Sequence, residues 1–215
     1  MELKLDLHVH TKYSRDCKTR IEDVVTHCHA EGLDGYALAD HDTVEGFDEA
    51  LNYRDDLIVI PGLEVTSMGG HVLALGVKRL IPPRLSIKET VERIHQQSGV
   101  AVLAHPYGVP RSWVNTGDVE EAGFDAIEVA NAAQFPYSYI RRRNQDLADR
   151  LGLPTTGGSD SHIPETIGRC YTLVESRSRK LSDVLESIAS GYTEVYGTGI
   201  TVRERVKKLV KDILR

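Results

Sequence analysis

Short apolar runs alternate with helical patterns along almost the whole chain, and this alternation limits the folds that are open to it. Several runs are continuously apolar, as in Val100–Ala104, which is typical of strands buried on both faces. Strand–helix alternation over about 200–250 residues is typical of a (β/α) barrel. A doubly wound open sheet is the alternative. Its nucleotide-binding version is disfavoured, because no glycine-rich phosphate loop follows the first strand.

The pattern predicts eight strands and six helices. The strands are expected at Leu3–Val9, Gly35–Ala39, Leu57–Pro61, His71–Val77, Val100–Ala104, Ala126–Val129, Pro154–Thr156 and Cys170–Val174. The first five helices are expected at Ile21–Glu31, Phe47–Leu51, Ile87–Gln97, Ser138–Leu151 and Leu181–Ser190. The last begins at Thr201 and is amphipathic, with one face formed by Val202, Val206, Leu209, Val210 and Ile213. We therefore expect one domain over residues 1–215, with the C-terminal helix (residues 201–215) packed on the barrel.

Composition narrows the class of protein. With 215 residues, 40% of them hydrophobic, the chain can form one domain with a full core and is not disordered. It lacks an apolar run of the roughly 18 residues that a membrane span needs, and its first residues do not resemble a signal peptide. Three widely spaced cysteines argue against disulfides and favour a cytoplasmic location. A net charge of −6 argues against long nucleic acid, but not against a small phosphorylated substrate held by metals.

Histidines and carboxylates gather where the predicted strands end. In a (β/α) barrel, the carboxyl ends of all strands meet at one face, where active sites are built. Imidazole and carboxylate groups together suit Zn, Mn or Fe, so the sequence predicts a metal site at that face. The residues concerned are His8, His10, Asp40, His41, Glu64, His105, Asp160 and His162, with His71 at the start of a strand.

Spacing separates these histidines from the others. His8 and His10 lie two apart on a predicted strand, so both imidazoles point to the same face and can bind one ion. His27 and His29 have the same spacing on a predicted helix, where they are about 200° apart. We therefore interpret His27, His29 and also His95 as structural or surface residues.

These residues resemble the PHP (polymerase and histidinol phosphatase) domain family, a branch related to the amidohydrolases. The segments Pro61–Glu64 and Gly70–Leu73 also fit, so the resemblance covers roughly residues 3–175. It implies an α/β fold of the distorted (β/α)7 barrel type and two or three divalent ions, either Mn, Zn or Fe. The four motifs that carry the resemblance appear in order as His8-Val9-His10-Thr11, Ala39-Asp40-His41-Asp42-Thr43, Ala104-His105-Pro106 and Gly158-Ser159-Asp160-Ser161-His162.

The resemblance also implies nine metal ligands in three sites. In the first site, one ion would be held by His8, His10 and Asp160. Glu64 would bridge to a second ion, which would be completed by His71 and His105. The third site would use His41, His162 and Asp16, from a loop one residue longer than the shortest version of this motif.

Such a centre predicts hydrolysis of a phosphate ester without a covalent enzyme intermediate. Adjacent metals lower the pKa of a bridging water towards 7, so that hydroxide is available to attack, and they neutralise charge on the phosphate. Asp40 is expected to orient a ligand or to carry a proton, as a catalytic residue beside His41. Beyond the metals, we expect the substrate to contact Arg111, Arg143 and Asn144.

Four functions fit this site to different degrees. The leading interpretation is a metal-dependent hydrolase that acts on a small phosphomonoester, such as a nucleotide or a nucleoside bisphosphate. The alternatives are a 3′–5′ exonuclease-type phosphodiesterase that acts on short nucleic acid, and a histidinol phosphatase. A non-catalytic scaffold is disfavoured, because nearly every ligand position is filled. The oligomeric state stays open, since the exposed faces carry no coiled-coil or edge-strand signal.

Overall fold

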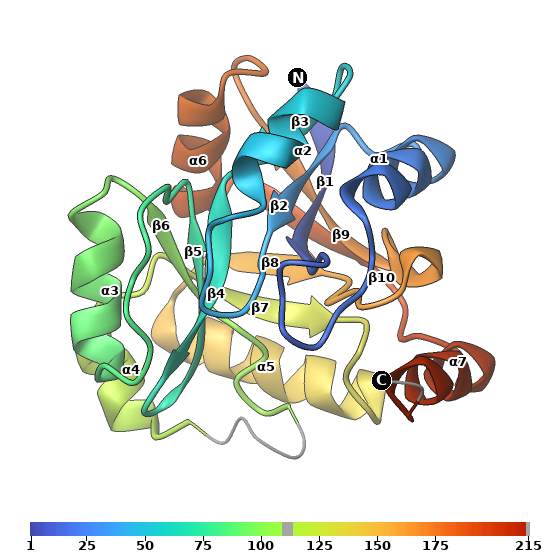
Figure 1. The fold of residues 1–215 in the computed structure, drawn as a ribbon. Coiled ribbons are helices and arrows are strands. Elements are labelled where there is room, and N and C mark those ends of the chain that lie inside the picture. The colour runs from blue at the N-terminus through green and yellow to red at the C-terminus, as the bar shows by residue number, and fades with distance from the viewer. Residues whose placement is uncertain (109–113, 214–215) are drawn as a thin grey trace.

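The strands form two five-stranded sheets in the computed structural model, which describes residues 1–108 and 114–213 (Figure 1). The first sheet has the order β10-β9-β1-β2-β3. In it, β1, β2 and β3 are parallel, while β9 runs antiparallel to both of its neighbours. The strands are β1 (Glu2–Val9), β2 (Gly35–Leu38), β3 (Ile58–Ile60), β9 (Cys170–Glu175) and β10 (Thr193–Gly197).

The second sheet has the order β4-β5-β6-β7-β8. Its strand β5 runs antiparallel to both neighbours, whereas β6, β7 and β8 are parallel. As a result, the start of β5 lies at the same edge as the carboxyl ends of the strands beside it. The strands are β4 (Gly62–Ser67), β5 (Gly70–Leu75), β6 (Val100–Leu103), β7 (Ala126–Asn131) and β8 (Thr155–Gly158).

Helices surround the strands (Figure 1). Helix α3 begins with a capping box, in which the Ser86 hydroxyl accepts from Glu89 N–H and the Glu89 carboxylate accepts from Ser86 N–H. Among the described residues, no helix is long and apolar enough to cross a bilayer. The helices are α1 (Ile21–Ala30), α2 (Phe47–Tyr53), α3 (Ile87–His95), α4 (Thr116–Ala122), α5 (Tyr137–Leu151), α6 (Leu181–Ala189) and α7 (Val202–Ile213), with a short 3-10 helix, η1, at Pro164–Thr166.

The α/β class is confirmed, but a closed (β/α)7 barrel is not. Within the described residues the β-pairing between the two sheets is limited to isolated bridges, Val9 with Ser161 and His41 with Glu64. One cause is Pro61, which stands alone between β3 and β4 and has no N–H to continue a ladder, so the chain passes from one sheet to the other there. The β4–β5 hairpin and the antiparallel β9 and β10 also interrupt the strand–helix repeat.

The core confirms that β6 is buried on both faces. Val100, Val102 and Ala104 pack between the two sheets, together with β1 and α6. Ala101 and Leu103 point the other way, into the apolar layer beneath α3, α4 and α5. Apolar side chains on both sides of the strand therefore explain its continuous apolar run.

The last helix differs from the expectation. Its apolar face is exposed, with Val202 at 76% and Leu209 at 59% of full exposure, and Val206 and Val210 are exposed as well. The polar side contacts the protein instead, because the Arg205 guanidinium donates to the carbonyl oxygens of residues 133 and 134. The Ile213 side chain lies outside the described residues. The sequence also did not predict β4, α4 and β10 as separate elements.

Gly158 at the end of β8 allows the chain to pass closely beside β1. A Cβ added there would lie 2.7 Å from the backbone nitrogen of His8 and 3.1 Å from its Cα. We expect Gly158→Ala to destabilise the metal-free protein by about 1–3 kcal/mol, because backbone must shift to make room. The measurement is urea unfolding of the purified variant.

Gly117→Ala is the matched control for this substitution. Its added Cβ would make only an ordinary contact, 3.5 Å from Asn115 Oδ1, within α4. Alanine in a helix should leave stability unchanged or raise it by about 0.5–1 kcal/mol. Equal stability of Gly158→Ala and the wild type would contradict the prediction, because it would show that a Cβ fits between β8 and β1.

Candidate metal centre

The carboxylate of Glu64 lies at the centre of a group of five histidines. It belongs to β4 and is 1% exposed. Its Oε1 is 2.8 Å from His71 Nδ1 and 3.0 Å from His105 Nε2. Its Oε2 lies 3.3 Å from His8 Nε2, 3.4 Å from His10 Nε2 and 3.2 Å from His41 Nδ1.

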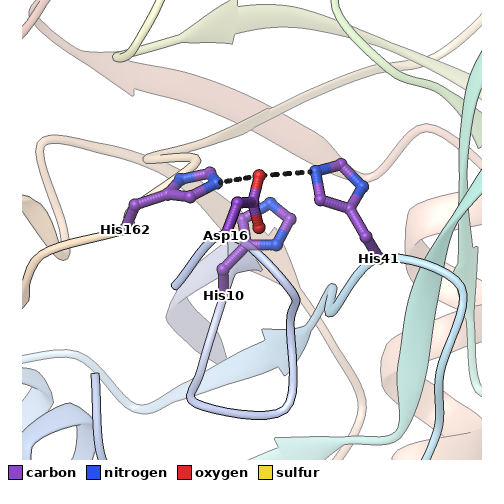
Figure 2. Close-up of side chains that lie close together, drawn as sticks. All are labelled: His10, Asp16, His41 and His162. Carbon is purple, nitrogen blue, oxygen red and sulfur yellow. Dashed lines mark hydrogen bonds and ion pairs between the residues drawn. The ribbon is translucent and has the colours of Figure 1, made fainter. Parts of the chain in front are cut away.

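A second group lies beside the first and contains Asp16 (Figure 2). One oxygen of Asp16 is 3.2 Å from His162 Nε2 and 3.4 Å from His41 Nε2. The Ser14 hydroxyl donates to its other oxygen at 2.8 Å. The structure therefore brings Asp16 to the histidines, although the spacing of its loop gave no separate support for this.

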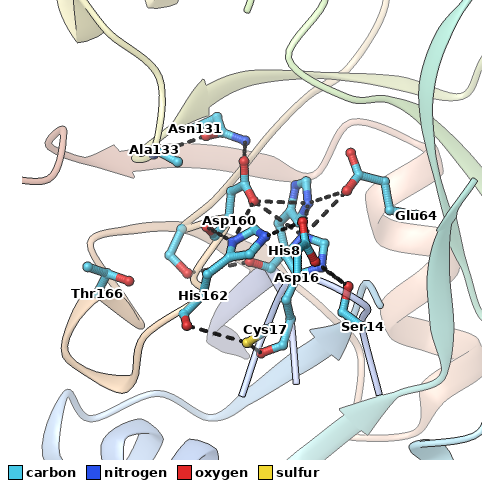
Figure 3. A network of polar contacts seen from close by, with 12 residues as sticks. His8, Ser14, Asp16, Cys17, Glu64, Asn131, Ala133, Asp160, His162 and Thr166 are labelled. Atoms are coloured by element: carbon cyan, nitrogen blue, oxygen red, sulfur yellow. Dashed lines mark hydrogen bonds and ion pairs between the residues drawn. The ribbon is translucent and has the colours of Figure 1, made fainter. Parts of the chain in front are cut away.

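Asp160 connects His8 of β1 with His162 (Figure 3). Its Oδ1 is 3.2 Å from His10 Nε2, 3.7 Å from His8 Nε2 and 3.5 Å from His162 Nδ1. All nine residues that the sequence predicted as ligands thus lie in one cluster.

Strand geometry explains which histidines enter the cluster. His8 and His10 share one side of the chain at the end of β1, with their Nε2 atoms 3.1 Å apart. His71 starts a strand but reaches the same edge because β5 is antiparallel. His27 instead bonds the Asp23 carbonyl one helical turn earlier, and His29 and His95 likewise belong to none of the ligand groups found among the described residues.

Two of the predicted ligands have left-handed backbone conformations. The φ angle is +30° at His105 and +51° at Asp160, a region that residues other than glycine rarely adopt. Hydrogen bonds hold both residues there, from His105 N–H to Glu128 Oε2 at 3.1 Å and from Asp160 N–H to the His8 carbonyl at 2.8 Å. Strain of this kind persists only where the surroundings impose it, as at binding sites.

Opposite charges keep Glu64 and His10 ionised despite their burial. Burial alone would raise the pKa of Glu64, but the charges of nearby imidazoles, that of His8 most of all, hold it well below its usual range. Burial would lower the pKa of His10, but its hydrogen bonds to Asp160 and Glu64 raise it to about 9. The centre therefore combines anionic oxygens with basic nitrogens, as a divalent cation requires.

The donor atoms form four groups, and within each group they lie within 4.8 Å of one another. His41 Nδ1 shows the fit to an ion most directly: it is buried and forms no hydrogen bond, although Glu64 Oε2 is 3.2 Å away. His41 Nδ1 and Glu64 Oε2 are therefore placed as two ligands of one ion. Histidine nitrogens together with carboxylate oxygens suit Zn, Mn or Fe. The groups are His8–His105–Asp160, His8–His10–Glu64, His41–Glu64–His71 and His10–Asp16–His41–His162.

This grouping differs in part from the expected one. His10 was assigned to a site with His8 and Asp160, and their donor atoms do lie within 3.1–3.7 Å of one another. His10 also joins Asp16 and the third group. His105 was assigned with Glu64 and His71, but it also lies with His8 and Asp160.

The other predicted site residues lie further from the centre. Asp40 accepts hydrogen bonds from the N–H and the hydroxyl of Thr11, at 2.6 and 2.7 Å, so both of its oxygens hold the residue after His10. The guanidinium of Arg143 lies over the ring of Tyr107, 4.2 Å from its centre. Arg111 lies outside the described residues.

Asn144 does not line the site, contrary to the expectation that it contacts substrate. It is fully buried, its Oδ1 accepts from Tyr107 N–H at 3.2 Å, and its Nδ2 donates to the carbonyl oxygen of Glu128 at 3.4 Å. Its amide therefore connects α5 to the backbone of β7 and of the loop after His105.

Sequence reasoning missed Glu128, which is fully buried and lies 2.9 Å from His8 Nδ1. The segment Ala126–Val129 was predicted as a strand. A charged residue inside that apolar run was the available signal, because a buried carboxylate needs a partner.

The chain is similar to known proteins in sequence. A model of the family described as PHP-associated matches residues 141–193. An uncharacterized protein of Methanocaldococcus jannaschii is 31% identical over 142 residues, which cover 60% of this chain and 82% of that protein. The 5′-3′ exoribonuclease Rnm of Escherichia coli is 35% identical over 97 residues, or 43% of this chain, and the match covers 32% of that enzyme.

Similarity of fold extends over nearly the whole chain. A two-domain protein from Bacteroides vulgatus, described as containing a predicted PHP-like metal-dependent phosphoesterase, superposes with a TM-score of 0.77. The superposition covers 99% of this chain and 70% of that one, at 20% sequence identity. At this identity the likeness concerns the fold.

Metal binding should become tighter as the pH rises. The pKa of His10 is about 9, so at neutral pH its imidazole carries a proton that a metal ion must displace. This group alone should raise the affinity by up to about tenfold per pH unit until the pH reaches its pKa. The measurement is a Mn²⁺ titration of chelator-treated protein at several pH values.

Stability of the metal-free protein should change in the opposite direction. A pKa raised from 6.5 to about 9 means that the folded state favours the charged imidazole. The stabilisation from His10 is therefore fully present below pH 6.5 and is lost as the pH rises through about 9. Urea unfolding over the same pH values measures it, and a flat profile in both experiments would contradict the raised pKa.

Proposed function

The chain belongs to the PHP family, and from that premise we propose that it is a metal-dependent hydrolase that acts on the phosphate ester of a small molecule. One observation carries the proposal: nine histidine and carboxylate side chains from both sheets converge on one cluster around Glu64. A set of this size offers enough donor atoms for more than one ion, as hydrolysis of phosphate esters by paired metals requires. The phosphoesterase named in the Bacteroides protein is consistent with this chemistry.

Bound divalent ions would supply positive charge for the phosphate oxygens and a water of lowered pKa. The chain's own residues fix where that chemistry takes place. Glu64 belongs to two of the four ligand groups and contacts histidines of the other two, and its lowered pKa keeps the carboxylate ionised. Asp40 holds Thr11 and thereby the end of β1, so we assign it a positioning role for His10 rather than contact with substrate.

The reaction proceeds without a covalent enzyme intermediate. Ser159, which comes directly before the ligand Asp160, is 1% exposed. Its hydroxyl donates to the His8 carbonyl at 3.4 Å, so it is directed at backbone rather than at a substrate. Water is therefore the nucleophile that we propose.

Arg143 and Tyr107 are our candidates for contact with the substrate. Tyr107 comes two residues after His105, and the Arg143 guanidinium stacks on its ring. Guanidinium binds phosphate oxygens in a bidentate manner, and the ring can pack against an organic group. Arg111, four positions after Tyr107 in the sequence, remains a further candidate.

Hydrolysis of short nucleic acid is the second candidate function. The similarity to an exoribonuclease over 97 residues favours it. The net charge of −6 disfavours it, because nucleic acid is bound mainly through basic groups. The phosphomonoester therefore remains the leading proposal.

The test is release of inorganic phosphate in the presence of Mn²⁺. The substrates are histidinol phosphate, mononucleotides, nucleoside 3′,5′-bisphosphates and a short single-stranded oligonucleotide. We expect strong release from one of the small esters and loss of that activity on addition of a chelator. Shortening of the oligonucleotide without phosphate release from the esters would favour the nuclease instead.

His10→Ala should reduce the activity by roughly 100-fold or more, because metal ions contribute several kcal/mol to such reactions. His29→Ala is the control, since His29 is exposed on α1 and outside every ligand group found among the described residues. The measurement combines phosphate release with the metal content of each variant. Equal activity and metal content in His10→Ala and the wild type would overturn the proposal.

A further inference from the structure

We propose that Glu128 and Asn131 of β7 are positioning residues for one ligand group of the centre, formed by His8, His105 and Asp160. Strand β7 lies between β6 and β8 and supplies none of the nine predicted ligands. The side chain of Glu128 is 0% exposed and that of Asn131 is 2% exposed. Both therefore act on the ligands and not on a substrate. The inference rests on the metal centre proposed above.

Glu128 fixes the orientation of His8. Its Oε1 lies 2.9 Å from His8 Nδ1 and accepts the proton on that nitrogen. The other nitrogen, Nε2, is then unprotonated in the neutral ring and faces His10 and Glu64. A carboxylate behind a metal-binding histidine sets the tautomer and makes the ring a stronger ligand.

The second oxygen of Glu128 holds the backbone at His105. Oε2 accepts from His105 N–H at 3.1 Å, at the residue whose φ is +30°. It also accepts from Asn131 Nδ2 at 3.0 Å. One buried carboxylate therefore orients His8 through its ring and His105 through its strained backbone.

Asn131 extends this contact to Asp160 (Figure 3). Its Nδ2 also donates to Asp160 Oδ2 at 3.2 Å, while its Oδ1 accepts from Ala133 N–H at 3.0 Å. The amide is fixed by partners on both sides. Asp160 Oδ1 is left to face the histidines, of which His10 is the nearest at 3.2 Å.

The two polar residues thus serve one ligand group in particular. Each member of the group His8–His105–Asp160 contacts Glu128 directly or through Asn131. The group that contains Asp16 has a different support, the Ser14 hydroxyl, which lies 2.8 Å from Asp16 Oδ1 and accepts from His41 N–H at 3.1 Å. Substitutions at Glu128 and at Asp16 should therefore weaken metal binding at different ligand groups.

Glu128→Gln tests the proposal without a change of size. The amide can still accept from His8 Nδ1, but its NH₂ group then meets the donors of His105 and Asn131. We expect metal affinity at this end of the centre to fall about 10–100-fold. Glu128→Asp keeps the charge and both acceptors on a shorter side chain, and should recover part of the affinity.

The experiment titrates chelator-treated protein with Mn²⁺ in competition with a chromophoric chelator, which gives the number of ions and the affinity of each. Asp16→Asn should weaken a different ion from the one that Glu128→Gln weakens, so the double variant should combine both losses. Glu121→Gln, the same chemical change on the exposed side of α4, is the control and should bind as the wild type does. Urea unfolding of each metal-free variant identifies a change that merely destabilises the fold.

Three results would overturn the proposal in distinguishable ways. If the wild type binds no divalent ion, the metal centre itself is wrong. If the wild type binds but Glu128→Gln binds equally well, only the role of β7 is wrong. If Glu128→Gln and Glu128→Asp lose all ions together with their stability, Glu128 supports the fold as a whole and not one ligand group.

Discussion

The carboxylate of Glu64 among five imidazoles is the interaction on which the rest of the structure depends. A carboxylate that is 1% exposed is stable only with positive partners, and these come from β1, β5 and the segments after β2 and β6. The chain crosses from the first sheet to the second directly after Pro61, so Glu64 on β4 lies between histidines of both sheets. The isolated β-bridge between His41 and Glu64 joins the two sheets, and both of its residues belong to the metal centre.

Local sequence predicts those parts of the centre that local geometry decides. The pair His8 and His10 was found because a strand places alternate side chains on one face, and the same rule separated it from His27 and His29. The burial of β6 on both faces followed from its apolar run. His71 was included in the set although it starts a strand, and the reason for its place became clear only from the antiparallel direction of β5.

Features decided by distant contacts were not predictable in this way. Whether the sheets close depends on pairing across β3 and β4, which no local pattern contains. Glu128 contacts His8, 120 positions away, so nothing in its neighbourhood revealed the partner. The orientation of α7 was misjudged for the same reason: contacts of Arg205 with the loop after β7 outweigh the pattern of the helix itself.

The attachment of α7 has a consequence for how the protein responds to salt. The helix is held by ionic contacts near the surface, including Arg169 with Glu204 and Lys207 with Glu165. The side chains of Val202, Val206, Leu209 and Val210 face water. Such contacts weaken as ionic strength rises, because dissolved ions screen them. The metal centre is buried and screened far less. Concentrated salt should therefore weaken the attachment of the C-terminal helix more than it disturbs the ligands.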